Sequence, residues 1–224
     1  MSSTDPTPGL ANPRSNKGTG LTQSPNFKYW VFGALAIGIF ASVVDHGSVN
    51  VALPTIAEEF NTDLPTIQWV VISYGLTYVS LMLIFGRLGD LFGYRRIFQT
   101  GLAISAVAFG LCATASQYEW LLVFRVVQGV GAALVVPGSL ALLSAHFPEA
   151  RRGRAIGQWA SFTTLAIALG PVLGGVLVDV ASWRWVFFIN LPLSAFLLAV
   201  LYAGVPESRD ERGARKLDIP GAVL

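Results

Sequence analysis

The stretch Leu64–Gly86, LPTIQWVVISYGLTYVSLMLIFG, decides the fold, because it contains no charged residue and is long enough to cross a bilayer. A transmembrane helix needs about 20 predominantly apolar residues. Five further stretches are of comparable length and carry at most one charge each: 29–54, 97–118, 120–145, 155–178 and 185–206. The sequence therefore predicts an all-α integral membrane protein with six spans.

The composition agrees with a membrane protein and excludes several other classes. Hydrophobic residues make up 53% of the 224 residues and charged residues only 12%, about half the usual charged share. So few charges cannot cover the surface of a soluble enzyme, and a net charge of +2 is too small to indicate nucleic-acid binding. The single cysteine, Cys112, excludes a disulfide framework and a cysteine-rich metal site. We expect no catalytic residues, no cofactor and no bound metal.

The spans divide the chain into three parts. Residues 1–28 are rich in Ser, Thr, Pro, Asn and Gly, which is typical of a disordered tail rather than a signal peptide. Residues 29–206 form the six-span domain. Residues 207–224 read as a charged linker followed by the start of a seventh span near Leu217, so we expect the sequence to be the N-terminal part of a longer protein. The alternative, a soluble helical protein with an unusually apolar core, does not explain six such stretches.

The distribution of Lys and Arg predicts the orientation. Thirteen of the fifteen lie in the N-terminal tail or after the second, fourth and sixth spans, and the loops after the first and third spans contain none. The other two are Arg184, after the fifth span, and Arg125, inside the fourth. Because cytoplasmic loops collect basic residues, we expect both ends of the chain to be cytoplasmic, in the cell membrane.

One motif occurs twice, 89 positions apart. Gly86-x-Leu88-x-Asp90 leads to Tyr94-Arg95 and then Ile97-Phe98, and residues 175–187 repeat this pattern of glycine, leucine, acid, aromatic, arginine and phenylalanine. The first copy joins spans two and three, and the second joins spans five and six on the other side of the membrane. Two inverted three-helix repeats explain this arrangement, and transporters built in this way bind substrate near the midplane between their repeats. The alternative is a chance likeness of two loops.

Asp45 and Arg125 are the only Asp, Glu, Lys or Arg residues deep inside the predicted spans. A charge at the centre of a membrane helix costs roughly 2.5–3.5 kcal/mol on insertion scales, so such residues face the bundle interior and find a partner. At about 1.5 Å per residue both fall in the outer half of the membrane, on the first helix of each repeat. We expect them to meet and to line the central cavity.

Two interpretations of Asp45 remain open. Burial raises the pKa of a carboxylic acid and a neighbouring arginine lowers it, so a conformational change could switch such a group between binding and releasing a proton. Alternatively, Asp45 and Arg125 form a structural ion pair that never titrates. His46 could titrate near neutral pH, but its position beside Asp45 favours packing against another helix. Trp69, Tyr74, Tyr78, Trp159 and Phe162 could line a site for a flat cation or could face lipid.

Five sequence blocks resemble the major facilitator superfamily, and four of them resemble its fourteen-span drug:proton antiporter branch. Residues 86–96, GRLGDLFGYRR, are similar to the family's signature loop. The other blocks are 45–54 (DHGSVNVALP), 125–132 (RVVQGVGA), 170–175 (GPVLGG) and 183–190 (WRWVFFIN). Within the first of these four, Gly47 stands where the branch usually has Thr, and His46 is unusual beside the acid.

The resemblance implies the roles of further residues. It adds Asn50 and Gln128 to the cavity beside Asp45 and Arg125. It implies a cytoplasmic gate in a tight loop, formed by Gly86, Asp90, Gly93, Arg95 and Arg96, although the two arginines could simply anchor the loop inside. Asp179 with Arg184 would be the outer counterpart. Gly170, Pro171, Gly174 and Gly175 would form the antiporter hinge, the alternative being close helix packing without motion.

The resemblance implies a secondary transporter that exports lipophilic or cationic small molecules in exchange for protons, by alternating access. Its partners would be the small-molecule substrate, protons, membrane lipid and the C-terminal half of the same transporter, which we expect to be monomeric. A proton symporter or facilitator of a metabolite on the same fold is the alternative. A receptor or scaffold fits less well, because a buried Asp and Arg would serve no purpose there.

Overall fold

The computed structural model describes residues 27–204, and all of its long elements are helices. Six helices or helix pairs are long and apolar enough to cross a membrane, which confirms the predicted six-span, all-α half-bundle. The proposed tail (except residues 27–28, which begin the first helix), the linker and the start of a seventh span lie outside the described residues. The helices are α1 (Phe27–Glu59), α2 (Leu64–Ile67), α3 (Trp69–Phe92), α4 (Tyr94–Ala113), α5 (Tyr118–His146), α6 (Glu149–Val180), α7 (Arg184–Phe188) and α8 (Asn190–Gly204).

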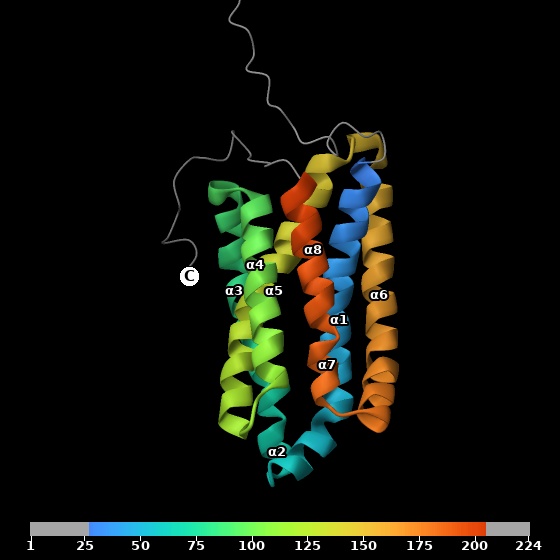
Figure 1. The fold of residues 1–224 in the computed structure, drawn as a ribbon. Helices are drawn as coiled ribbons and strands as arrows, with labels where there is room; N and C mark the ends of the chain where they lie inside the picture. The colour runs from blue at the N-terminus through green and yellow to red at the C-terminus, as the bar shows by residue number, and fades with distance from the viewer. Residues whose placement is uncertain (1–26, 205–224) are drawn as a thin grey trace, which may run out of the picture.

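The helices stand side by side in one bundle (Figure 1). Helix formation follows from the medium, since a segment surrounded by lipid must satisfy its backbone hydrogen bonds internally. Helix α2 continues into α3 and α7 into α8, so each pair forms one span. The beginning of α1 and the end of α8 lie at one end of the bundle and α2 lies at the other, as an even number of spans requires.

The predicted cytoplasmic loop is much shorter than expected. Helix α3 continues to Phe92 and α4 begins at Tyr94, so Gly93 is the only residue between them. Gly93 has φ 93°, a conformation that residues with a side chain rarely adopt, and this explains why glycine stands there. Gly86, Asp90, Arg95 and Arg96 are therefore helical residues on either side of a one-residue turn rather than members of a loop.

The two three-helix repeats interlock. Helix α1 packs along α6, and α5 packs along α3, so the first helix of each repeat lies against the second helix of the other. Helix α4 packs along α5 and also against α8, the third span of the other repeat. The contact between α1 and α6 brings the proposed hinge beside Asp45.

Equivalent arginines in the two motif copies make equivalent contacts. The Arg95 guanidinium, at the start of α4, donates to the Leu201 carbonyl oxygen at 3.0 Å, near the end of α8. The Arg184 guanidinium, at the start of α7, donates to the Ala115 carbonyl oxygen at 3.0 Å, just beyond the end of α4. Each arginine thus satisfies a carbonyl at the C-terminal end of the other repeat's third span, where helix carbonyls lack partners. This reciprocity supports the inverted repeat deduced from the sequence.

Candidate functional site: a buried ion pair behind a cavity

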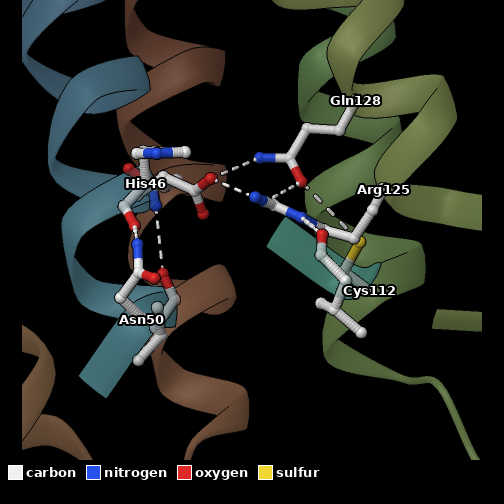
Figure 2. Close-up of polar contacts among 9 residues, drawn as sticks. His46, Asn50, Cys112, Arg125 and Gln128 are labelled. Carbon is white, nitrogen blue, oxygen red and sulfur yellow. Dashed lines mark hydrogen bonds and ion pairs between the residues drawn. The ribbon is translucent and has the colours of Figure 1, made fainter. Parts of the chain in front are cut away.

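Asp45 of α1 and Arg125 of α5 meet inside the bundle. Arg125 Nη1 donates to Asp45 Oδ2 at 2.8 Å and to Gln128 Oε1 at 2.7 Å. Gln128 Nε2 donates to the same Asp45 oxygen at 2.8 Å, which closes a three-residue network. Figure 2 shows Arg125 and Gln128 reaching from α5 towards α1, with Cys112 beside them. The structure therefore brings together three of the four residues expected at this site.

Arg125 is also held by groups that do not depend on Asp45. Its Nε donates to the Val70 carbonyl oxygen at 3.0 Å. The guanidinium carbon lies 4.3 Å from the centre of the Tyr74 ring and 5.9 Å from that of Phe187, distances at which aromatic faces attract cations. These contacts would keep the guanidinium in place even if Asp45 were neutral.

Asp45 Oδ1 is buried and has no hydrogen-bond partner among the described residues. Buried carboxylate oxygens are normally satisfied, so an unpartnered one calls for an explanation such as an ordered water or a functional role. The two oxygens of Asp45 therefore differ, because Oδ2 accepts from Arg125 and Gln128 while Oδ1 has no described partner.

The ion pair lies behind the cavity wall, in contrast to the expectation that it would line the cavity. The side chains of Asp45 and Arg125 are both 0% exposed. A cavity of about 500 Å³ lies beside them, bounded by α1, α3, α5 and α6. Its polar and aromatic lining consists of Ser42, His46, Tyr74, Tyr78, Trp159 and Thr163. No Asp, Glu, Lys or Arg is among the described residues that line it.

His46 faces the cavity, although the sequence favoured packing against another helix. Its side chain is exposed and lines the cavity, with its ring centre 5.6 Å from that of Tyr74. Asn50, four residues further along α1, is also exposed, and its Nδ2 donates to the His46 carbonyl oxygen at 2.8 Å. The structure therefore does not bring Asn50 into the Asp45–Arg125 network.

The proposed hinge residues form the contact between α6 and α1. A side-chain carbon added to Gly174 would lie 2.6 Å from Ser48 Cα, and one added to Gly170 would lie 3.0 Å from Gly47 Cα. Ser48 Oγ also donates to the Gly170 carbonyl oxygen at 2.7 Å. A side-chain carbon on Gly47 would in turn lie 3.1 Å from Pro171 Cδ, which explains why glycine rather than threonine stands at position 47 here.

The residues of the proposed gate make specific contacts of their own. The Tyr94 hydroxyl donates to Asp90 Oδ1 across the Gly93 turn. A side-chain carbon on Gly89, next to Asp90, would collide with the Tyr94 ring, so Gly89 is sterically required although it was not among the predicted site residues. Gly86 has more room, since the nearest atom to an added carbon, Pro137 Cβ, would be 4.0 Å away.

The outer counterpart uses a different acid from the one expected. Arg184 Nη1 pairs with Glu59 Oε1 at 2.6 Å, whereas the sequence suggested Asp179, which is exposed at the end of α6. Trp183 Nε1 donates to the other Glu59 oxygen at 2.6 Å. Sequence reasoning missed Glu59 and Ser48, whose contacts depend on how helices distant in the chain pack. It included Tyr74 only as one of several aromatic residues that could line a cavity.

Within residues 27–204, no group of three or more His, Cys, Asp or Glu side chains is placed so as to hold a metal ion.

Comparison with known proteins identifies relatives along almost the whole described chain. The family model described as Major Facilitator Superfamily matches residues 35–221. The multidrug resistance protein Stp of Mycobacterium tuberculosis is 40% identical over 192 residues, which cover 85% of this chain and 36% of that protein. The riboflavin transporter RibZ of Clostridioides difficile is 32% identical over 197 residues, covering 88% of this chain and 43% of that protein.

A solved structure has the same fold. The inward-facing, occupied form of a bacterial homologue of the human lysosomal transporter Spinster superposes with a TM-score of 0.69 at 18% sequence identity. The match covers 88% of this chain and 48% of that one. The chain therefore spans less than half the length of the relatives and the structure described here.

Proposed function

Because the chain belongs to the major facilitator superfamily, a family of membrane transporters, we propose that it forms the N-terminal half of a proton-coupled exporter. Its substrates would be lipophilic or cationic small molecules, moved across the cell membrane by alternating access. The N-terminus would be cytoplasmic, as the placement of Lys and Arg indicates. The remaining spans would close the cavity from the other side, and the complete protein would act as a monomer.

The observation that carries the proposal is the asymmetric Asp45 carboxylate. Oδ2 accepts two hydrogen bonds, and Oδ1 is buried without a described partner. A proton that arrives at Oδ1 neutralises Asp45, while Val70, Gln128 and the Tyr74 ring continue to hold Arg125. Proton binding thereby loosens the link between α1 and α5 without expelling the guanidinium from its site. A change in helix position at this link is what coupling between protons and transport requires.

The remaining predicted residues would supply the motion and its control. Gly170 and Gly174 bring α6 against α1 one turn from Asp45. A sliding movement of α6 would therefore shift α1 and change the geometry of the ion pair. Asp90, Arg95 and Arg96, beside the Gly93 turn, would act as the cytoplasmic gate against the missing half. Gly175 would lie at the edge of the sliding surface, since an added carbon there would make only an ordinary contact with Val51.

The test is transport driven by a pH jump in inverted vesicles that contain the transporter of which this sequence is part. Asp45→Asn keeps the size of the side chain but cannot bind a proton at Oδ1. We expect it to abolish proton-driven accumulation of a fluorescent cation such as ethidium while substrate binding persists. Asp63→Asn, which removes an exposed acid just before α2, is the matched control and should transport normally. Unchanged accumulation by Asp45→Asn would refute proton coupling through this residue.

A second candidate function is transport of a metabolite, by symport or facilitation. The similarity to a protein named as a riboflavin transporter supports it. The same vesicles distinguish the two functions, because a symporter moves its substrate and protons in the same direction. Uptake of riboflavin accompanied by proton entry would favour this candidate over export.

A further inference from the structure

Tyr74 is in contact with both the cavity and the buried ion pair. Its side chain is 6% exposed and lines the cavity. Its ring centre lies 4.3 Å from the guanidinium carbon of Arg125, which is 0% exposed. Tyr74 thus occupies the boundary between the space that a ligand can enter and the interior in which Asp45 lies.

The position of Tyr74 is fixed by the backbone beneath it. A side-chain carbon on Gly129 of α5 would lie 2.7 Å from the Tyr74 carbonyl oxygen, so α3 and α5 approach one another closely at this level. Gly129 directly follows Gln128, a member of the Asp45 network. Because the backbone contact sets the distance between the helices, the Tyr74 ring cannot withdraw from Arg125 unless its side chain rotates or the helices separate.

Neighbouring rings extend this boundary along the cavity. The Tyr78 ring stacks on that of Tyr74, with centres 6.3 Å apart and planes 12° apart, and His46 faces Tyr74 from α1, with ring centres 5.6 Å apart. Neither Tyr78 nor His46 has a described ring contact with Arg125. A flat ligand that stacks in the cavity would therefore touch Tyr74, which holds Arg125, and also Tyr78 and His46, which do not.

We propose that Tyr74 is the positioning residue that separates Asp45 from the cavity and transmits cavity occupancy to the ion pair. Its ring face holds Arg125 on Asp45 and keeps water from the unpartnered Asp45 oxygen, Oδ1. The link to transport rests on the proposed function, but the barrier itself is a property of this chain and can be measured without transport.

The experiment measures how readily Asp45 reacts with a reagent from the aqueous phase. The transporter of which this sequence is part is treated in detergent micelles with a water-soluble carbodiimide and glycine ethyl ester, and modification of Asp45 is followed by peptide mass spectrometry. Tyr74→Leu retains an apolar side chain but removes the aromatic face, and we expect modification to become roughly tenfold faster. Tyr74→Phe retains the ring and should react at about the wild-type rate.

Two controls make the result specific. Tyr78→Leu removes a tyrosine from the same stack and cavity wall without removing the contact with Arg125, so it should also react at about the wild-type rate. Cys112 is buried beside Gln128 and is the only cysteine in the sequence. It should resist a maleimide in every variant, which reports that the bundle remains folded. If Tyr74→Leu proves unstable by this criterion, Tyr74→Met provides the same comparison.

Faster modification of Asp45 in Tyr74→Leu or Tyr74→Met, and in no other variant, would support the proposal that the Tyr74 ring shields Asp45. Equal rates for Tyr74→Leu and wild type, or equal acceleration by Tyr78→Leu, would overturn it. A different result, namely normal proton-driven transport by Asp45→Asn, would refute the proposed function. The two hypotheses can therefore be refuted independently.

Discussion

Two ion pairs join α1 to the second helix repeat, and they differ mainly in their surroundings. Asp45–Arg125 spans 2.8 Å with both side chains 0% exposed, whereas Glu59–Arg184 spans 2.6 Å with side chains 41% and 29% exposed. Both acids belong to α1, and both arginines belong to the second repeat. Both pairs join a carboxylate to a guanidinium, so burial is the main difference between them.

Burial changes what each pair can do. An exposed pair is typically worth about 0.2–1 kcal/mol because water screens it. A buried pair must recover the cost of removing two charges from water, and losing one partner leaves the other charge uncompensated. Glu59–Arg184 is therefore suited to hold the end of α1 against the start of α7, while Asp45–Arg125 is sensitive to any change in charge. The sensitivity of the buried pair to charge suits a conformational switch, whereas a contact that only holds two helices together does not need it.

The largest effect should come from removing the cation of the buried pair. Arg125→Leu leaves Asp45 charged and buried, and we expect a loss of about 3–5 kcal/mol in the free energy of unfolding. Unfolding in detergent micelles followed by circular dichroism measures it. The double variant Asp45→Asn/Arg125→Leu should recover much of the loss, since no unpaired charge remains. A double variant as unstable as the single one would show that packing, not charge, dominates at this site.

A smaller effect should come from separating α1, which carries both acids, from α6. Gly174→Ala places a carbon 2.6 Å from the Ser48 backbone, so we expect about 1–3 kcal/mol of destabilisation. Gly175→Ala is the matched control, because its added carbon meets only Val51 at 3.9 Å. The same unfolding assay compares them. Equal stability of the two variants would mean that α1 and α6 are not in the close contact described here.

The exposed pair should matter less still. Glu59→Gln keeps an acceptor for Trp183 but removes the charge that faces Arg184, and we expect a loss of about 0.2–1 kcal/mol that shrinks as salt is added. Glu58→Gln, at the exposed neighbouring residue, controls for the general effect of removing an acid from this end of α1. A loss as large as that of Arg125→Leu would contradict the contrast between the pairs.

The smallest effect should be at Asn50, the motif residue that lies outside the buried network. Asn50→Ala removes an exposed side chain whose described hydrogen bond stays within α1, so stability should change by less than about 0.5 kcal/mol. Gln128→Leu removes a buried group that bonds both members of the ion pair, and it should be clearly less stable. Similar values for the two variants would show that Gln128 adds nothing to the network.

The sequence predicted the features that follow from polarity along the chain. Six apolar stretches, four of them without any charge, predicted the spans, and the isolation of Asp45 and Arg125 in the other two predicted that they would meet. It did not predict that His46 would face the cavity while Asp45 lies behind its wall, because that depends on how α1 is rotated. It also assigned Arg184 to Asp179 instead of Glu59. Neighbours along the chain do not show which distant helix end lies closer, and only the packing of α1 against α7 brings Glu59 to Arg184.

We propose that Asp45 binds and releases a proton while it remains inside the bundle. Infrared difference spectroscopy measures this directly, since a protonated carboxylic acid has a carbonyl stretching band that a carboxylate lacks. We predict a band that appears reversibly as the pH of the folded protein is lowered, and that is missing from Asp45→Asn but present in Glu59→Gln. If Asp45→Asn removes no titrating band at any pH at which the protein stays folded, the pair with Arg125 is purely structural and Asp45 carries no proton.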